Sequence, residues 1–417
     1  MIVLVLNAGS SSLKYQVAQA ETATVLMSGL VERIGTPDAR MSVVTGGKRI
    51  SRTANAPSHG AALELIFRTV VDSEIGVLGQ VSEIDAVGHR VLHSGHAFDD
   101  STLITEEVLR ELERHDDLAP LHNPYNVLGV REAMRLLPDV PHVAVFDSTF
   151  FGKMPDHAAY YALPVEYAED QKVRRHGIHG TSYRYVTREI ARLLDRPAEQ
   201  LRMIVCHLGS GSSVTAVEHG TAVDTSAGLT PLEGLVMGTR SGDVDAGVVF
   251  FLIRRCGLGV DEVEALLNRR SGMLGVSGVS NDMRDVLEHA ERGNERCRLA
   301  ADMYVYRIKK YIGAYAAAMG GVDVLAFTGG IGEHAAVIRS SICADMTWLG
   351  IRLDETSNAA GRSGIRRISA HDSETDVLVV PADEERIIVE DTLRLVGYTA
   401  DDGAAALRVS KPPARTG

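Results

Sequence analysis

Three short runs rich in Gly and Ser follow apolar segments of strand length, and they are well suited to binding phosphate. The runs are Gly9 to Ser12, Gly209 to Ser213 and Gly329 to Gly332. Because Gly and Ser put little bulk in the way, their backbone N–H groups can approach phosphate oxygens closely. Single Arg, His, Asp and Glu residues are interspersed with these turns. Together they offer what phosphoryl transfer needs, namely a polyphosphate cradle, metal ligands, and cations that stabilise the moving phosphoryl group.

The commoner nucleotide-binding motifs are absent from the sequence. No segment fits GxxxxGK[ST], and the glycines near Gly209 and Gly330 are not spaced as GxGxxG. Neither a P-loop nor a Rossmann dinucleotide site is therefore predicted.

Apolar runs of strand length recur along the chain, with helix-like stretches between them. This alternation predicts an α/β fold with partly buried sheets. The expected strands are Ile2 to Leu6, Val143 to Phe146, Met203 to Cys206, Val322 to Phe327 and Val377 to Val380, and the expected helices are Glu106 to His115, Tyr183 to Leu194, Val260 to Leu267 and Arg298 to Met319.

Two segments resemble each other. IVLVLNAGSSSLKYQV from Ile2 and MIVCHLGSGSSVTAV from Met203 both read as a strand, a turn of small residues and a second strand. Each pattern predicts a β-hairpin, and one hairpin in each half is what a duplicated fold would give. Because Gly/Ser turns after strands are common, duplication and chance both remain open from the pattern alone.

Length and charge narrow the class of protein. With 417 residues and 45% hydrophobic residues, the chain is expected to form two domains. The net charge of -12 argues against nucleic-acid binding, since a phosphate backbone needs a basic face. The N-terminus has neither a signal-peptide pattern nor an apolar run long enough for a membrane span. We therefore expect a cytoplasmic protein with small-molecule partners, without nucleic-acid or membrane partners.

Ten segments, in order and over nearly the whole chain, resemble the acetate kinases. They are NAGSSSLK (Asn7 to Lys14), GHRVLHSG (Gly88 to Gly95), PLHNP (Pro120 to Pro124), VFDSTF (Val145 to Phe150), RRHGIHGTS (Arg174 to Ser182), HLGSGSS (His207 to Ser213), TPLEGLVMGTRSGDVD (Thr230 to Asp245), SGVSNDMRD (Ser277 to Asp285), FTGGIGEH (Phe327 to His334) and ADEE (Ala382 to Glu385).

The resemblance implies a fold and an activity. The fold would be two duplicated ribonuclease-H-like domains of the actin, hexokinase and heat-shock chaperone ATPase superfamily. The first domain would contain residues 1–150 and about 384–400, with a C-terminal segment around Val377 to Tyr398 returning to it. The second, residues 151–383, would bind the nucleotide and form a homodimer, and residues 401–417 would be a flexible tail. The activity would be reversible, Mg²⁺-dependent transfer of a phosphoryl group from ATP to acetate, with Mn²⁺ able to replace Mg²⁺.

The resemblance also assigns residues to catalysis. A guanidinium binds a carboxylate through two parallel hydrogen bonds, so Arg90 becomes the acetate-binding residue rather than part of a surface ion pair. Arg240 and His179 would act on the transferring phosphoryl group. The family treats Asp147 as catalytic. Because acetate is already ionised at pH 7 and needs no base, orienting Arg90 or a magnesium-bound water fits Asp147 better.

The metal and the phosphates would be held by residues near both ends of the chain. Asn7 and Glu384 match the expected Mg²⁺ ligands, since magnesium prefers oxygen ligands and keeps most of its waters. Lys14, Ser10 and Ser12 would help to hold the phosphates.

The remaining nucleotide contacts fall on three segments. They are His207, Leu208, Gly209, Ser210 and Gly211; Asp282, Met283 and Arg284; and Gly330, Ile331, Gly332, Glu333 and His334. Several positions depart from the residues usual in the family, among them Ser210, Met283, His334 and Tyr183.

The acyl group of the substrate is expected in an apolar pocket of Leu92, Leu121, Ile178 and Pro231. Leu92 stands where Val is frequent in the family, so it takes up more of the pocket. Ile178 stands where Phe is frequent in the family, so it leaves more of the pocket open. Two alternatives remain: a propionate or butyrate kinase of the same family, and a non-catalytic ATP-binding module. The presence of Arg90, Arg240 and His179 together favours an enzyme, since a nucleotide switch has no use for a carboxylate clamp.

Overall fold

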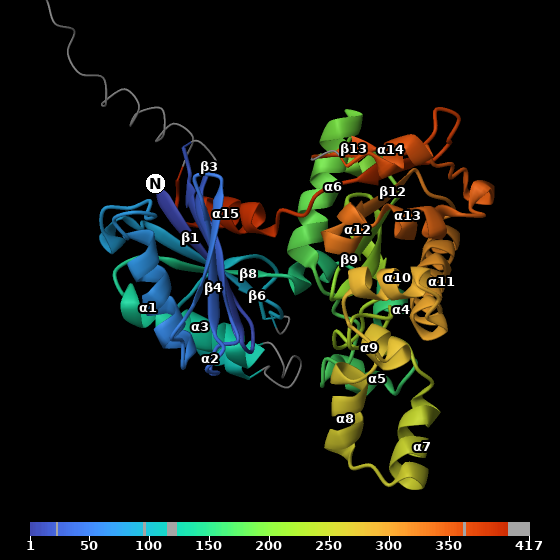
Figure 1. Ribbon diagram of the computed structural model, residues 1–417, viewed down its shortest axis with the longest axis horizontal. Coiled ribbons are helices and arrows are strands. Elements are labelled where there is room, and N and C mark those ends of the chain that lie inside the picture. The colour runs from blue at the N-terminus through green and yellow to red at the C-terminus, as the bar shows by residue number, and fades with distance from the viewer. Residues whose placement is uncertain (22–23, 95–96, 115–122, 362–363, 399–417) are drawn as a thin grey trace, which may run out of the picture. The chain divides into compact units, whose positions relative to one another are not determined.

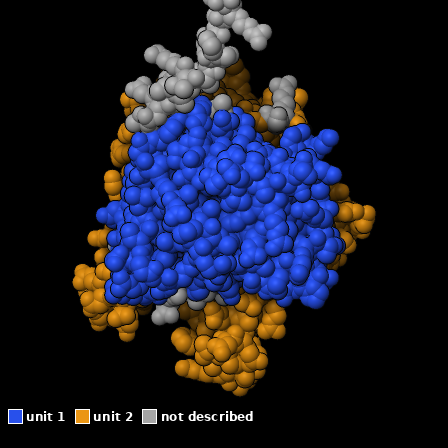
Figure 2. All heavy atoms as spheres, turned by 90° about the vertical axis from the view of Figure 1, so that its left-hand side faces the viewer, with its two compact units in different colours: residues 1–149, 384–417 blue, residues 150–383 orange. Residues whose placement is uncertain are grey.

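The computed structural model describes residues 1–21, 24–94, 97–114, 123–361 and 364–398. They form two compact units, which Figure 2 distinguishes by colour. Unit 1 contains residues 1–149 and the described residues from 384 onward, and unit 2 contains residues 150–383. Leu121 and the expected tail, residues 401–417, lie outside the described residues.

Unit 1 is built on a sheet with the strand order β5-β4-β3-β2-β1-β6-β8-β7. Figure 1 labels β1, β3, β4, β6 and β8 of this sheet. Strand β1 (Ile2–Ala8) pairs antiparallel with β2 (Ser12–Gln19) and parallel with β6 (Ala86–Val91), which pairs parallel with β8 (His142–Phe146). The other strands are β3 (Thr24–Glu32), β4 (Arg40–Thr45), β5 (Lys48–Thr53) and β7 (Thr102–Leu103).

Helices pack on both faces of this sheet. Leu4 and Leu6 of β1 enter one core with helices α1 (His59–Val70) and α3 (Asn123–Leu136), and α2 (Glu106–Glu113) packs on α3. Because side chains alternate along a strand, Asn7 points to the opposite face. Helix α15 (Glu384–Leu395) covers that face, where a Cβ on Gly88 would lie 2.5 Å from Ile388.

Unit 2 is built on a sheet with the order β11-β10-β9-β12-β14-β13. Strand β9 (Met203–Leu208) pairs antiparallel with β10 (Ser212–Glu218) and parallel with β12 (Val324–Thr328), and β12 pairs parallel with β14 (Asp376–Val379). The outer strands are β11 (Thr221–Thr225) and β13 (Arg366–Arg367).

The two sheets share one topology. The order β3-β2-β1-β6-β8 in unit 1 repeats as β11-β10-β9-β12-β14 in unit 2, with three antiparallel strands followed by two parallel ones in each. This confirms duplicated ribonuclease-H-like domains, so the similarity between the two hairpin sequences is not chance. The expectation that the chain returns to the first domain from about Val377 was wrong for β14, which is a strand of unit 2. Among the described residues after Val377, those of helix α15 pack on the first sheet.

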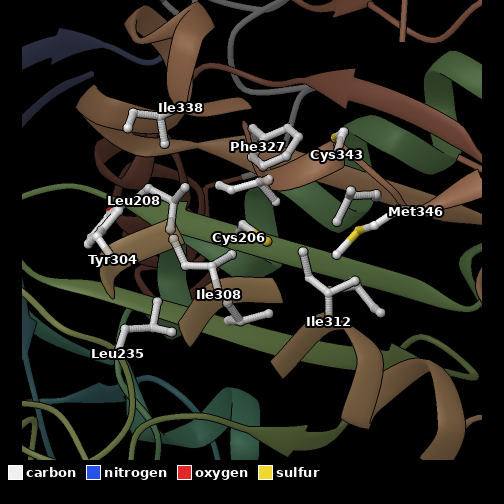
Figure 3. Close-up of a cluster of buried hydrophobic side chains, with 14 of the residues drawn as sticks. Cys206, Leu208, Leu235, Tyr304, Ile308, Ile312, Phe327, Ile338, Cys343 and Met346 are labelled. Carbon is white, nitrogen blue, oxygen red and sulfur yellow. The ribbon is translucent and has the colours of Figure 1, made fainter. Parts of the chain in front are cut away.

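The long helix α11 (Glu295–Ala318) builds the main core of unit 2. Asn294 caps its N-terminus by accepting a hydrogen bond from the backbone N–H of Cys297. Tyr304, Ile308, Ile312 and Tyr315 recur every three or four residues, so they lie on one side of the helix. Figure 3 shows how the first three of these pack with Cys206 and Leu208 of β9.

The remaining helices of unit 2 connect these layers. They are α4 (Asp156–Ala159), α5 (Val165–Glu169), α6 (Gly180–Leu194), α7 (Ala246–Cys256), α8 (Val260–Arg269), α9 (Gly272–Ser277), α10 (Met283–Glu291), α12 (Gly329–His334), α13 (Ala336–Cys343) and α14 (Glu355–Ala359). In the described part of the chain, no helix has the length and apolar character needed to span a bilayer.

One local prediction was wrong. The run Gly329 to Gly332 is the start of α12 rather than a turn, because Gly329 takes a positive φ of 75° that redirects the chain from β12 straight into the helix. Glycine is a poor helix former, which hid the helix in the sequence.

Candidate active site

Arg90 and Asp147 meet where two parallel strands of unit 1 end. Arg90 lies in the last part of β6, and Asp147 directly follows β8. Asp147 Oδ2 accepts hydrogen bonds from Arg90 Nη2 at 2.5 Å and from Nε at 3.1 Å. Burial lowers the pKa of Arg90, but Asp147 and Glu384 more than offset it and raise the pKa above its ordinary value. The guanidinium is therefore firmly charged, and 20% of its side chain is exposed to a ligand.

Acidic side chains from α15 adjoin this pair. Glu384 Oε2 lies 3.7 Å from Arg90 Nε, and Glu385 forms an ion pair with Lys14 of β2. Burial raises the pKa of Glu384; Arg90 opposes this rise, while Asp147 and Glu385 add to it. A cluster with this excess of carboxylates favours the approach of a cation.

Asn7 belongs to the same region of unit 1. It pairs in register with Lys14, which reaches Glu385, and it points to the face covered by α15. Within the described residues no group of three His, Cys, Asp or Glu side chains could hold a metal ion. Magnesium does not require such a group, because water and phosphate oxygens supply most of its ligands. The amide oxygen of Asn7 and the carboxylate of Glu384 fit it.

The turn between β1 and β2 presents the other predicted phosphate ligands. Gly9 N donates to Ser12 O at 2.8 Å, which closes the turn. Ser10 and Lys14 are exposed and Ser12 is half-buried, so their polar groups can reach a ligand. Leu92, the predicted pocket residue after β6, is buried in unit 1.

In unit 2, His179 and Arg240 converge on the turn between β9 and β10. A Cβ placed on Gly211 would lie 3.5 Å from His179 Nε2 and 3.9 Å from Arg240 Nη1. Arg240 comes from the loop before α7, and burial lowers the pKa of its guanidinium below the ordinary value. Ile178, the residue before His179, is buried, and Pro231 is half-buried.

The His179 ring is fixed from two sides. His179 is the residue directly before α6, and its backbone takes the left-handed conformation, with a positive φ of 61°. Its Nδ1 shares a hydrogen bond with Ser213 Oγ at 2.9 Å, and Tyr183 OH reaches the same oxygen at 2.6 Å. The ring stacks on His207, with 4.0 Å between ring centroids. Tyr183 therefore acts on His179 indirectly, through the hydroxyl of Ser213.

A cavity of about 550 Å³ in unit 2 collects most of the predicted nucleotide contacts. This volume falls in the range of small-molecule sites. Its predicted lining residues are Gly209, Ser210, Asp282, Met283, Arg284, Gly330, Ile331 and His334.

Five more residues, which the sequence did not predict, line the cavity. They are Asn281, Leu287, Ala335, Ala336 and Val337. Leu287 could have been found, because it lies one helical turn after Met283 on α10 and so faces the same way. Ala336 and Val337 open α13, whose start carried no sequence signal.

Five predicted nucleotide contacts do not line this cavity: His207, Leu208, Gly211, Gly332 and Glu333. Leu208 points into the hydrophobic core, and His207 is bound to Ser182 at 2.8 Å. Glu333 instead links α12 to two later segments of unit 2. Its Oε1 accepts a hydrogen bond from Ala382 N, and its backbone oxygen accepts one from Arg366.

The sequence matches the acetokinase family over residues 2–390. It is 49% identical over 397 residues to an acetate kinase of Halothermothrix orenii, covering 95% of this chain and 100% of that one. It is also 49% identical over 400 residues to an acetate kinase of Thermotoga maritima, covering 95% and 99% of the two chains.

Solved structures agree with these matches. The fold is similar to that of the Porphyromonas gingivalis acetate kinase, with a TM-score of 0.89, 46% identity and coverage of 95% of this chain and 99% of that one. It is also similar to that of a propionate kinase from Francisella tularensis, with a TM-score of 0.88, 36% identity and coverage of 94% and 99%. The family resemblance seen in the ten sequence segments is thereby confirmed.

Proposed function

The chain belongs to the acetokinase family, and on this premise we propose that it transfers the terminal phosphoryl group of ATP to acetate, giving acetyl phosphate and ADP. An acetate oxygen attacks the γ-phosphorus, a new O–P bond forms, and the bond to the β–γ bridging oxygen breaks. ADP leaves with that electron pair. Because the product is a mixed anhydride, the reaction also runs backwards to make ATP.

The observation that carries this proposal is the Arg90–Asp147 pair. Asp147 is fully buried and already bound to Arg90 through two hydrogen bonds. It is therefore a positioning residue rather than a base, and acetate needs none. The oriented guanidinium binds the substrate carboxylate through parallel hydrogen bonds.

Arg240 and His179 act at the phosphoryl group. The transferring group spreads negative charge over its equatorial oxygens, and donors fixed in advance stabilise that charge. Both side chains reach the Gly211 turn, and the ring of His179 is fixed by Ser213 and stacking on His207. The fixed ring of His179 supports this role, because a donor held in place beforehand needs little rearrangement during transfer.

The donor is ATP, and its adenosine end is assigned to the cavity of unit 2. Met283 and Ile331 offer apolar surface to a base, while Asp282 and Arg284 supply polar groups at its edge. Glu384 and Asn7 would hold Mg²⁺, or Mn²⁺ in its place. When bound, the cation supplies charge neutralisation to the phosphates. Since the reaction draws on ATP, we place it in the cytoplasm.

A homodimer is the proposed assembly. Helix α7 is rich in apolar residues, yet none of its residues is buried, and Phe250 and Phe251 are each more than half exposed. Apolar surface of this kind marks an interaction site. Sedimentation velocity should therefore give twice the mass of one chain, and a monomer at micromolar concentration would remove this assignment.

The reverse reaction tests the proposed function with high sensitivity. Purified protein, acetyl phosphate and MgADP should produce ATP, detected by luciferase, with one acetate released for each ATP. Arg90→Ala should abolish this signal while leaving the thermal unfolding temperature within a few degrees of wild type. Phosphorylation of propionate is a second candidate, favoured by the similarity to the Francisella tularensis propionate kinase.

A further inference from the structure

The N-terminal turn of α3 touches two segments that carry predicted ligands. One is the end of β1 with the turn that leads into β2, which includes Gly9, and we call it the phosphate turn (residues 7–12). The other is the end of β6 with the two residues after it, Leu92 and His93, and we call it the acetate segment (residues 90–93). Both belong to unit 1, so their arrangement around α3 is fixed within one compact unit.

A single side chain joins the two segments. Asn126 Nδ2 donates to Ala8 O in the phosphate turn at 2.6 Å, and Asn126 Oδ1 accepts from Leu92 N in the acetate segment at 3.1 Å. Asn126 is 7% exposed, so water does not compete freely for these bonds. Both halves of the amide are thus used, one for each segment.

The phosphate turn is held in a definite orientation. Besides the bond to Ala8 O, His59 Nε2 donates to Gly9 O at 2.7 Å. In a trans peptide the C=O and N–H groups point in opposite directions, so the N–H of Ser10 points away from His59. A fixed N–H at an exposed turn is what a phosphate oxygen requires.

Helix α3 is also seated closely on this turn. Gly129 lies three residues after Asn126 and therefore on the same side of the helix. A Cβ on Gly129 would lie 2.7 Å from the Ala8 Cβ, closer than real Cβ atoms approach. The glycine thus permits the approach that the hydrogen bond to Ala8 O needs.

We propose that Asn126 is a positioning residue that sets the phosphate turn relative to the acetate segment. It touches neither substrate and acts through backbone groups of Ala8 and Leu92. This inference rests on the proposed function, because it assumes that the two segments serve two substrates of one reaction. Its consequence is that loss of Asn126 weakens the binding of both substrates together.

The chain provides a matched control on the same helix. Asn123 is fully buried and also makes two hydrogen bonds, since Oδ1 accepts from His93 N and Nδ2 donates to His93 O, both at 3.2 Å. Both bonds serve the acetate segment. Asn123→Ala therefore removes as many hydrogen bonds as Asn126→Ala but leaves the phosphate turn untouched.

The test is to measure KM for acetate, KM for MgATP, kcat and the unfolding temperature of both variants. We expect each variant to raise KM for acetate about three- to tenfold, as loss of one or two hydrogen bonds implies. Only Asn126→Ala should also raise KM for MgATP by a similar factor. The proposal is overturned if Asn126→Ala leaves KM for MgATP within about twofold of wild type, or if Asn123→Ala raises it equally.

Should Asn126→Ala fail to fold, Asn126→Asp carries the test at mildly alkaline pH. The ionised carboxylate still accepts from Leu92 N but can no longer donate to Ala8 O. It should raise KM for MgATP while KM for acetate stays near wild type, and the reverse pattern contradicts the proposal. A purely structural role would instead lower the unfolding temperature and kcat with both KM values unchanged. A wild type without activity on acetate would overturn the proposed function itself.

Discussion

Asp147 Oδ2 accepts hydrogen bonds from both Nε and Nη2 of Arg90, at 3.1 and 2.5 Å. The carboxylate therefore occupies the Nε side of the guanidinium, and the Nη1–Nη2 edge is the one that we propose binds the substrate carboxylate. Asp147 is fully buried and Arg90 is not, so Arg90 is the member of the pair that a ligand can reach. We therefore expect Asp147 to determine how well Arg90 binds acetate.

Replacing Asp147 should therefore act through Arg90. Asp147→Asn keeps the shape but loses the charge, and we expect kcat/KM for acetate to fall about 10- to 100-fold, the range for breaking a buried charged pair. The double variant with Arg90→Ala should be no worse than Arg90→Ala alone, because the two residues act as a unit. Independent, multiplying losses in this double-mutant cycle would show that Asp147 has a separate catalytic role.

Arg240 should matter mainly in the transition state. Its charge is needed as the phosphoryl group moves, so Arg240→Ala should lower kcat about a thousandfold, while KM for acetate changes little. Arg240→Lys, which keeps the charge but not the planar fork, should recover only part of the loss. A tenfold rise in KM with kcat intact would place Arg240 in ground-state binding instead.

Glu384 should determine the magnesium requirement. Glu384→Ala removes a carboxylate ligand from a hard cation, so the Mg²⁺ concentration for half-maximal rate should rise about tenfold or more. Glu385→Ala is the neighbouring control, because Glu385 pairs with Lys14 rather than with Arg90. Equal magnesium titrations for wild type and Glu384→Ala would move the metal site elsewhere.

The raised pKa of Glu384 has a consequence for stability without magnesium. As pH rises from 4.5, the ordinary value for glutamate, the unfolded chain loses this proton first. The folded state binds more protons in that window, so stability falls until pH passes the folded pKa. Glu384→Gln should therefore unfold at a higher temperature than wild type at neutral pH, by a margin that shrinks as pH falls towards 4.5. Calorimetry in EDTA measures this margin, and a margin that is constant with pH would contradict the assignment.

Leu92 should limit the length of the acyl chain. Leu92→Ala enlarges the predicted pocket, and a buried methylene gains about 0.8 kcal/mol if it fits without strain. The ratio of kcat/KM for acetate over propionate should therefore fall about three- to tenfold in this variant. Leu92→Val, a smaller change, should give an intermediate ratio. An unchanged ratio in Leu92→Ala would show that Leu92 does not line the acyl pocket.

The sequence predicted those elements whose signal is local. Both hairpins were visible because strand, Gly/Ser turn and strand are contiguous, and α11 was visible through its apolar spacing. Strands β4 and β5 were not predicted, since they lie towards the edge of the sheet and β5 carries charged, exposed residues. Duplication could not be settled from the two hairpins. It became clear only from the pairing of β6 with β1 in one sheet and of β12 with β9 in the other, which are long-range contacts.

In the site, too, local motifs were predictable and long-range contacts were not. Separate motifs predict Arg90, Asp147 and Glu384 as site residues, but their mutual contacts depend on the register of β6 and β8 and on the position of α15 in unit 1. Asn126 was not singled out because an amide within a helix has no signature of its own. Its function depends on the carbonyl of Ala8, which lies 118 residues away in the chain.

The most direct test of the account is a hydroxamate assay for acyl phosphate, run with saturating MgATP and with acetate, propionate and butyrate over a concentration series. We expect acetate to give the highest kcat/KM, propionate to follow within about one to two orders of magnitude, and butyrate to be poorer still, because an apolar pocket discriminates single methylenes only modestly. A preference for propionate or butyrate, or the absence of acyl phosphate with every carboxylate, would contradict the account.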